Sequence, residues 1–444
     1  MLQASSIKQR ALDLGFDLVG IASPSAAKDL AFLPQWIKLG YGGEMRYLAN
    51  PKREDPRRIL PSVKSILCVG LIYNTPYPYS TEVVGISHRE EDSSTHTLSN
   101  DDAPSRGWIS RYAWGKDYHK IMRSKLEQLR AAVEKMAAGV ETCVFVDTGP
   151  VMERAFARLS GIGWMGKNTC LINQEKGSWL FLGVILTSLE LDLDLPAPDR
   201  CGSCTKCIEA CPTNALAEPY VMDASRCIAY LNIELRGAIP EEFRPAIGQN
   251  IFGCDICQDV CPWNKRPLSV VSGQSSVVSD ESAEVRSPLP VGGSQWPPAP
   301  SQLPSLDSRE DFSKIDSTQR QAATTVLAEF QPMRIKIEPV GPAEDSAYED
   351  ATTQLPPAKN FSLFNPTLEE LALMTEEDFK RVFAKSPIKR TKYRGWRRNL
   401  CVVMGNSGDR RFIPWLEAVA ADADAVVGEH AAWALRRLQG GVSK

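Results

Sequence analysis

The sequence predicts a layered α/β domain over residues 1–195, a small cysteine-rich domain over 196–266 and a short helical domain over 360–444. Helical and strand-like patterns alternate along the first of these, as expected for helices that cover a sheet. Eight of the twelve cysteines of the chain fall within residues 201–261. Beyond residue 360, apolar residues recur at helical spacing. These three observations divide the 444 residues into three units.

The α/β domain is expected to contain buried strands and amphipathic helices. Residues 65–73 are a continuous apolar run of strand length, which is typical of a strand covered on both faces, and residues 140–146 are expected to form another buried strand. The apolar residues between Met122 and Met136 lie on one face of a long helix. The other expected elements are a helix at 7–14, an extended segment at 16–22, a helix that ends at Ser160, and strands at 169–172 and 182–187. A polar loop at 76–105 is expected to be exposed.

Asp147 comes directly after the strand expected at 140–146. Open α/β sheets bind their ligands at the carboxyl ends of strands, so this position indicates a catalytic or binding role. Asp147 also precedes a helix, and aspartate commonly caps a helix N-terminus. The pattern alone leaves both interpretations open.

Gly161, Gly163 and Gly166 match the spacing of a dinucleotide-binding motif, but the required context is missing. That motif follows a strand and opens a helix, whereas this string follows a helix and leads to a strand. We interpret it as a tight glycine turn whose backbone can approach a ligand closely.

The cysteines form two runs with one member between them. The spacing of two residues lets successive thiolates converge on one inorganic centre, and the Cys-Pro ending of each run sends its last cysteine to the other centre, as in two-cluster ferredoxins. The sequence therefore predicts a ferredoxin-like domain with two [4Fe-4S] clusters. The expected ligands are Cys201, Cys204, Cys207 and Cys261 for one cluster, and Cys211, Cys227, Cys254 and Cys257 for the other.

Two alternatives to iron–sulfur clusters fit the cysteine pattern less well. Structural zinc sites also use four cysteines with two-residue spacing, but they rarely need a third cysteine two residues on, followed by Cys-Pro. A disulfide framework is typical of small secreted domains, whereas this chain is long and begins with no secretory pattern. Cys68, Cys143, Cys170 and Cys401 lie in apolar runs and are expected in the core.

No segment is expected to cross a membrane. The first 22 residues place Lys8 and Asp13 among apolar positions, and the most apolar run, 179–189, is too short for a bilayer. We therefore expect a cytoplasmic protein, and 43% hydrophobic residues suffice for sizeable cores. The serine- and proline-rich stretch 267–359 is expected to be a disordered insertion.

The C-terminal region combines helical faces with a basic run. Helical faces at 396–404, 412–419 and 427–438, joined by short turns, resemble HEAT-type repeats. Between Lys380 and Arg398, basic residues occur without acidic ones and are interleaved with aromatic rings. Such clusters bind phosphate backbones and stack on bases, although a solvated helix face is the alternative. The candidate RNA contacts are Lys389, Arg390, Arg394, Arg397 and Arg398.

Taken together, these motifs resemble the epoxyqueuosine reductases, cobalamin-dependent enzymes that complete the synthesis of queuosine in tRNA. The matching stretches are Arg111–His119, Val146–Arg154, Gly163–Asn168, both cysteine runs, Ser386–Arg390, Arg398–Leu400 and Gly405–Asn406. The resemblance implies an α/β domain like that of reductive dehalogenases, which clamps a cobalamin against the cluster domain. It also implies that the C-terminal helices present the anticodon loop. Cluster electrons would make the cobalt nucleophilic enough to attack the epoxide, and loss of water would leave the cyclopentene ring.

The resemblance also suggests roles for single residues. It makes Asp147 the proton donor, and a carboxyl group enclosed by a corrin and apolar side chains would have a raised pKa. Some relatives place a cysteine near the cobalt where this chain has Ala113, so a thiol there is not essential. His119 belongs to the same motif, but a lone histidine is more often structural than a metal ligand. The remaining candidate cobalamin contacts are Arg53 or Arg57, Lys167, Asn168, Ala229 and Asp255.

Two other functions are compatible with parts of the pattern. A corrinoid reductive dehalogenase would share the corrin and the two clusters, but it would lack the basic C-terminal helices. An iron–sulfur electron carrier would use the α/β domain only for docking. The expected partners are tRNA with epoxyqueuosine in its anticodon loop and an electron donor that the sequence does not identify. The protein is expected to act as a monomer.

Overall fold

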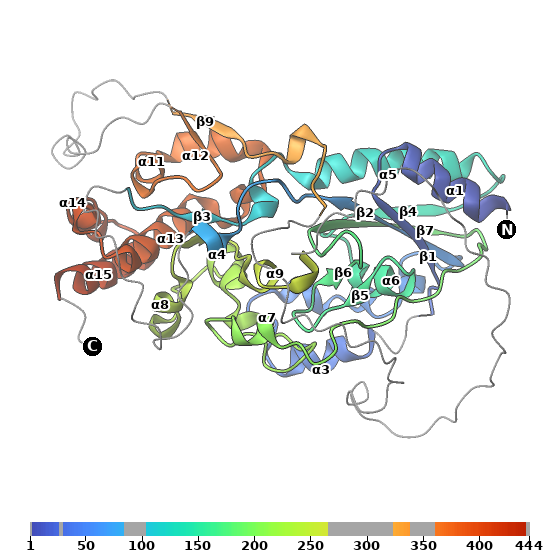
Figure 1. Cartoon of the computed structure of the whole chain (residues 1–444), viewed down its shortest axis with the longest axis horizontal. Coiled ribbons are helices and arrows are strands. Elements are labelled where there is room, and N and C mark those ends of the chain that lie inside the picture. The colour runs from blue at the N-terminus through green and yellow to red at the C-terminus, as the bar shows by residue number, and fades with distance from the viewer. Residues whose placement is uncertain (1, 26–29, 84–103, 265–322, 338–359, 441–444) are drawn as a thin grey trace.

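A four-stranded sheet organises the N-terminal part of the computed structural model, which describes residues 2–25, 30–83, 104–264, 323–337 and 360–440 (Figure 1). The strand order is β1-β2-β7-β4, and each pairing in this sheet is antiparallel. The strands are β1 (Leu18–Ala22), β2 (Ser65–Ile72), β4 (Thr142–Phe145) and β7 (Leu180–Thr187). Since β2 and β4 both run antiparallel to β7, their carboxyl ends lie at the same edge of the sheet.

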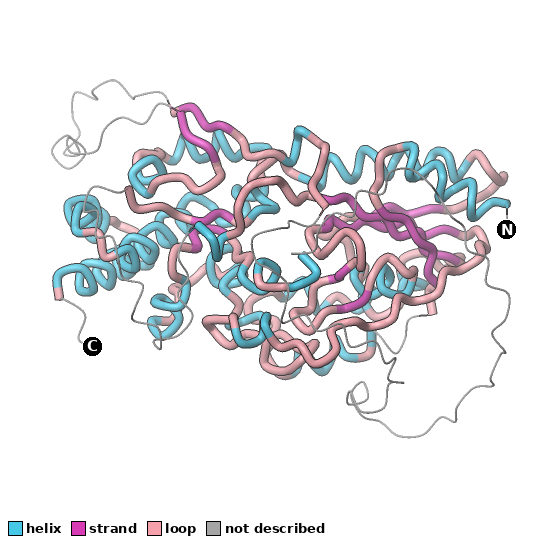
Figure 2. The backbone as a smooth tube through the Cα atoms, viewed as in Figure 1, coloured by secondary structure: helices cyan, strands magenta, loops and turns pink. Residues whose placement is uncertain are grey.

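Helices cover both faces of this sheet, as the apolar runs predicted (Figure 2). Alternate residues of β2 point to opposite faces. Leu67 and its alternating neighbours pack with α1 (Leu2–Asp13) and α5 (Tyr118–Glu134). Ile66 and Cys68 pack on the other side with α6 (Glu153–Leu159). The result is the expected three-layer arrangement.

The cysteine-rich region consists mostly of loops and short helices (Figure 2). Its elements are α7 (Lys206–Glu209), a π-helix (Tyr230–Glu234), α8 (Arg244–Ile247), β8 (Asn250–Phe252) and α9 (Ile256–Asp259). The short helices before it include α3 (Phe32–Lys38), α4 (Ser80–Val83) and several 3-10 helices. Ser80 is buried and donates its backbone N–H to Asp259, 3.0 Å away, so the loop expected to be exposed from residue 76 is packed at its start. Residues 84–103 of that loop lie outside the described residues.

The glycine string forms a hairpin, in which β5 (Trp164–Met165) pairs with β6 (Leu171–Ile172). A Cβ on Gly163 would collide with the backbone carbonyl of Ile172 in the facing strand. The glycine therefore permits a close approach within the chain. The expectation that the backbone of this turn also approaches a ligand stays a prediction.

The C-terminal part is helical. Its helices are α11 (Leu368–Ala372), α12 (Glu376–Val382), α13 (Lys392–Ser407), α14 (Ile413–Ala420) and α15 (Ala425–Gln439). Thr367 and Thr375 each form a capping box, which explains why α11 and α12 begin where they do. No described helix has the length and apolarity needed to span a membrane.

Segments from all three expected units share one core. β3 (Trp108–Ile109) pairs in parallel with β8, and both strands are completely buried together with the C-terminal helices. Leu368 donates its backbone N–H to Ser105, at 2.8 Å. Residues around 105–114 thus pack with the cluster region and α13 instead of with the sheet.

Part of the stretch expected to be a disordered insertion is ordered. β9 (Arg334–Lys336) pairs with β10 (Asn360–Ser362). Phe330 packs against Phe181 of β7 with ring centroids 5.0 Å apart, and Ile335 is buried in the core beside the C-terminal helices. The expectation for 267–359 is therefore wrong for residues 323–337. Residues 267–322 and 338–359 lie outside the described part of the chain.

Candidate active site and cluster region

Asp147 lies just beyond the end of β4, in the loop that leads to α6. Its φ angle is +51°, a left-handed conformation that is uncommon for residues other than glycine, and half of its side chain is exposed. The N-cap position of α6 is Met152, and it makes no side-chain capping bond. The structure therefore rejects the interpretation of Asp147 as the cap of this helix.

His119 connects Asp147 to a second carboxylate. The Nε2 atom of His119 is 3.2 Å from Oδ2 of Asp147, and its Nδ1 atom is 2.7 Å from Oδ1 of Asp117. Asp117 is the N-cap of α5 and also accepts the backbone N–H of His119, at 3.2 Å. Because both ring nitrogens face carboxylate oxygens, the imidazolium form can donate to both. His119 therefore lies in the candidate site, with both ring nitrogens satisfied by carboxylates, as expected for a structural histidine.

The protonation of this group follows from its charges. Burial alone would lower the pKa of His119, but the hydrogen bonds that it donates to Asp117 and Asp147 raise the pKa to about 9. Burial alone would raise the pKa of Asp147, but the hydrogen bond and charge of His119 lower it below its usual value. The expected raised pKa of Asp147 is thus not produced by the protein's own groups, which keep the proton on His119 instead.

A second protonated group lies beside the Asp147 loop. Burial raises the pKa of Glu153, at the start of α6, to about 8, and the charge of Asp147 adds to this effect. The Oε1 atom of Glu153 has no hydrogen-bond partner among the described residues. Glu153 therefore keeps a proton at neutral pH.

Of the two arginines proposed from sequence, Arg53 faces the Asp147 loop. Arg53 is buried, and its Nη1 atom lies 3.3 Å from the carbonyl of Val151. Its Nε atom has no hydrogen-bond partner among the described residues. Arg57 is largely exposed and binds Ser25 and Asp55 instead. Of the two arginines, the geometry thus favours Arg53 as the candidate cobalamin contact.

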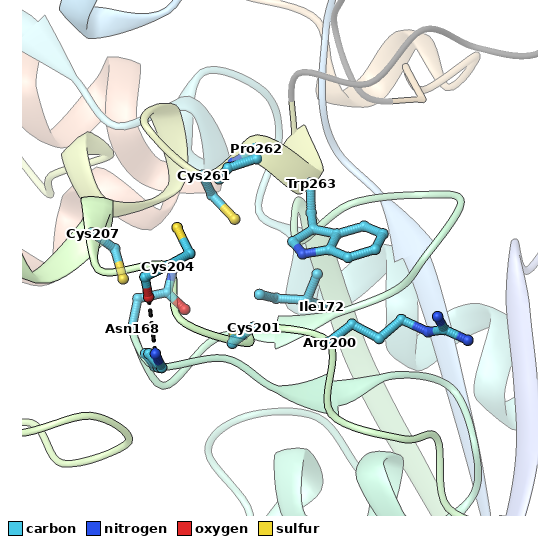
Figure 3. A pocket seen from close by; sticks show the side chains of 10 residues that line it. Asn168, Ile172, Arg200, Cys201, Cys204, Cys207, Cys261, Pro262 and Trp263 are labelled. Carbon is cyan, nitrogen blue, oxygen red and sulfur yellow. Dashed lines mark hydrogen bonds between the residues drawn. The ribbon is translucent and has the colours of Figure 1, made fainter. Parts of the chain in front are cut away.

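The cysteines predicted for the first cluster line one pocket. Cys201, Cys204, Cys207 and Cys261 share this pocket with Trp263 and other residues (Figure 3). In the described part of the chain, no group of three or more His, Cys, Asp or Glu side chains converges closely enough to hold a single metal ion.

The second set of cysteines gathers separately. Cys227 lies close enough to Cys211 for their charges to interact, and both are in electrostatic reach of Cys254. Cys257 is likewise near Cys254 and Cys227. The last cysteine of each run thus lies with members of the other run, in the exchanged arrangement that the spacing predicted.

A ninth cysteine lies against the second set. Cys170 makes a side-chain hydrogen bond with Cys257. It follows the hairpin turn after Lys167 and Asn168, and its apolar neighbours indicated only a core position. No feature of the cysteine spacing in the sequence identifies this contact.

Lys167 and Asn168 bind the backbone of the cysteine loops. The Nζ atom of Lys167 donates to the carbonyls of Gly202 and Cys204, at 2.7 and 3.0 Å. The amide of Asn168 donates to the carbonyl of Cys257, at 3.1 Å. These two side chains were expected at a cobalamin, but the described contacts make them clasps that fix both cysteine runs to the hairpin.

Asp255 and Ala229 also occupy structural positions. Asp255 is buried and accepts hydrogen bonds from Trp108 Nε1, Ser110 Oγ and Arg111 N, at 3.0, 2.5 and 2.7 Å. Its carboxylate is therefore used within the protein, and its expected place beside a cofactor stays a prediction. Ala229 precedes the π-helix and packs against the large core.

The five basic candidates divide into outward and inward groups. Lys389 and Arg394 are about half exposed and pair with Asp117 and Asp424, at 2.7 and 2.5 Å. Arg390 is about one-third exposed, pairs with Glu234 at 2.6 Å and lies beside the ring of Tyr47. Arg397 is mostly covered and pairs with Asp422.

Arg398 is buried and donates to backbone carbonyls. It is therefore unavailable to RNA, contrary to the expectation from the charge run.

Comparison with known proteins identifies two matching family models. Residues 53–148 match the model described as "Epoxyqueuosine reductase QueG, DUF1730", and residues 200–264 match a 4Fe-4S double cluster binding domain. The epoxyqueuosine reductase of Xanthomonas campestris is 34% identical over 97% of this chain and 95% of its own length. That of Escherichia coli K12 is 32% identical over 96% of this chain and 86% of its own.

Solved structures give the same result. An epoxyqueuosine reductase bound to an epoxyqueuosine-modified tRNA-Tyr stem loop matches 98% of this chain and 89% of its own, with a TM-score of 0.67 and 26% identity. A Bacillus subtilis epoxyqueuosine reductase, whose catalytic aspartate loop is swung out of the active site, matches 98% of this chain and 90% of its own, with a TM-score of 0.67 and 25% identity.

Proposed function

The chain belongs to the epoxyqueuosine reductase family and reduces epoxyqueuosine in tRNA; from this premise we propose how its own residues divide the reaction. The dehalogenase and electron-carrier interpretations have no better support in these comparisons. The observation that carries the proposal is the contact of Asp147 with His119 at the end of β4.

The reaction requires protons, and the site holds them. Conversion of an epoxide to an alkene consumes two electrons and two protons and releases one water. His119 and Glu153 both carry a proton at neutral pH, because their pKa values are raised to about 9 and about 8. Asp147 lies against His119 and is half exposed. We assign Asp147 as the residue that passes a proton to the substrate oxygen. His119 is the group that supplies this proton to Asp147.

Electrons would enter through the cysteine-rich region. The proposed ligands are the two exchanged sets, Cys201, Cys204, Cys207 and Cys261, and Cys211, Cys227, Cys254 and Cys257; the shared pocket of the first set supports this division. Such clusters, when bound, transfer single electrons. Lys167 and Asn168 hold both loops in place through their backbone carbonyls.

Cobalamin is the proposed cofactor beside Asp147. The unpartnered Nε of buried Arg53 supports this assignment, because a bound group with an acceptor atom would satisfy it. Asp147, whose side chain is half exposed, is the other residue that would contact the cobalamin. When bound, a reduced corrin supplies the electrons that open the epoxide. His119 and Arg53 hold the loop that carries Asp147, and we propose that this loop corresponds to the one that swings in the Bacillus subtilis relative.

The proposed RNA face consists of Lys389, Arg390 and Arg394, which are the exposed members of the basic run. The C-terminal helices would support it as a HEAT-like platform. We propose that the protein is a cytoplasmic monomer and that it receives electrons from a separate donor.

Replacement of Asp147 by Asn tests the assignment. We expect loss of turnover of epoxyqueuosine-containing stem-loop RNA, with unchanged iron and sulfide content and unchanged RNA affinity, because Asn cannot pass a proton. Asp13→Asn is the matched control, since Asp13 is exposed on α1 and accepts a hydrogen bond from Gln9, far from the Asp147 loop in the sequence. Near-normal turnover by Asp147→Asn would refute the role of this carboxyl group.

A further inference from the structure

A chain of four charged side chains begins in the proposed RNA face and ends at Asp147. Its members are Lys389, Asp117, His119 and Asp147. Lys389 Nζ is 2.7 Å from Oδ2 of Asp117, although the two residues are 272 positions apart. Oδ1 of Asp117 is 2.7 Å from Nδ1 of His119, and Nε2 of His119 is 3.2 Å from Asp147. A second contact braces the same segments, because Asp117 donates its backbone N–H to the carbonyl of Lys385, at 2.7 Å.

The two ends of this connection differ in their access to solvent. The side chain of Lys389 is 48% exposed, whereas that of Asp117 is 7% exposed. A phosphate group can therefore reach Lys389 but not Asp117. The ammonium group of Lys389 has three N–H donors and no acceptor, so a phosphate can compete with Asp117 for it. This competition leaves the hydrogen bond between Asp117 and His119 in place.

Other titratable groups also face the pair, and they set the background against which Lys389 acts. Asp117 is the nearest carboxylate to His119 besides Asp147, and each of its oxygens has one cationic partner. When Lys389 no longer neutralises one oxygen, the negative charge of Asp117 attracts the His119 imidazolium more strongly at the other. The further groups in electrostatic reach of Asp147 are Tyr47, Tyr112, Tyr118, Glu153 and Arg390.

We propose that Lys389 is a positioning residue: when a backbone phosphate of the substrate RNA engages its ammonium group, Asp117 holds the His119 imidazolium more strongly and so keeps a proton beside Asp147 while RNA is bound. The inference rests on the proposed function, since it takes RNA as the ligand and Asp147 as the acid. It adds a role for Lys389 beyond affinity. Binding of the correct substrate would then secure the proton that the reaction consumes.

The titration of His119 measures this coupling directly. The chain has four histidines, so selective 13C-histidine labelling gives a sparse spectrum, and the His119→Gln variant assigns the signal. The cluster-loaded protein is titrated with and without a saturating unmodified anticodon stem-loop RNA, whose binding is measured separately by fluorescence anisotropy. We expect RNA to move the His119 midpoint upward by roughly half a pH unit.

Three variants distinguish the coupling from a general effect of RNA charge. Lys389→Gln should have an elevated midpoint without RNA and should not respond to RNA, because removal of the cation imitates its neutralisation. Lys389→Arg should restore the response. Lys385→Gln, an exposed lysine four positions away, should behave like the wild type.

Each result decides between outcomes. A midpoint that RNA shifts equally in wild type and Lys389→Gln would overturn the inference, as would bound RNA that leaves the wild-type midpoint unchanged; both leave the proposed function standing. Failure of the stem loop to bind would refute the proposed RNA face together with the inference.

Discussion

Replacement of Arg398 by Met separates a structural arginine from an RNA contact. The guanidinium group of Arg398 donates to the carbonyls of Leu231, Leu235 and Gly237, each at 2.8 Å. It also donates to Oδ1 of Asn399. Only 1% of the residue is exposed. Met preserves much of the aliphatic length but removes every donor.

The expected loss of stability follows from the three backbone carbonyls. Each buried acceptor that loses its partner costs about 1–3 kcal/mol. Part of this cost is offset, because the variant no longer buries a charge whose pKa is already lowered by burial to about 10. We expect a net loss of about 3–5 kcal/mol in the free energy of unfolding, or a decrease of about 3–5 °C in the melting temperature of a chain of this length.

Calorimetry and RNA binding together provide the test. Arg394→Met is the matched control, because Arg394 is half exposed and its pair with Asp424 contributes at most about 1 kcal/mol. Arg394→Met should melt like the wild type, and the slope of log affinity against log salt concentration should decrease by about one. Arg398→Met should have a lower melting temperature than the wild type and an unchanged salt slope of RNA affinity. An Arg398→Met variant that melts like the wild type but loses RNA affinity would refute the buried assignment.

Phe330→Ala should lower the free energy of unfolding by about 3–5 kcal/mol in the same calorimetric assay, because Phe330 is buried against Phe181; an unchanged melting temperature would show that residues 323–337 do not pack on the sheet. Cys227→Ala should about halve the iron content per chain, measured by a colorimetric iron assay, whereas Cys143→Ala should leave it unchanged; two intact clusters without Cys227 would contradict the ligand set. The kcat should stay high at neutral pH and fall as pH rises through about 9, since the pKa of His119 is raised and its proton persists up to that range; a decrease centred near pH 6.5 would contradict this assignment.

Local sequence patterns predicted the secondary structure well, because burial dictates them. The continuous apolarity of β2 reflects two covered faces, and the helical spacing of Met122, Leu126 and Leu129 reflects the one face that α5 buries. The cysteine spacing likewise predicted which thiolates lie together, since spacing constrains which of them can converge.

Contacts between distant residues were not readable in the same way. The partner of His119 is 28 positions away and that of Lys389 is 272 positions away, so no local pattern relates them. A charge run does not reveal which of its members point inward, and Arg398 lies on the buried side of α13. Residues 323–337 are apolar at about half of their positions, but they adjoin serine- and proline-rich sequence, and their partners in β7 and β10 are distant in the chain.

The crossing of segments around β3 has a consequence for biosynthesis. Arg106 donates to the carbonyl of Asn365, 259 positions later in the chain. A ribosome adding about 5–20 residues per second needs roughly ten to fifty seconds to make that interval. Until then the partners of Trp108 and Phe252 in the C-terminal helices do not exist, and the shared core cannot close. Iron–sulfur assembly on a nascent chain would therefore proceed on an open scaffold, which favours cluster delivery after the ribosome has released the protein.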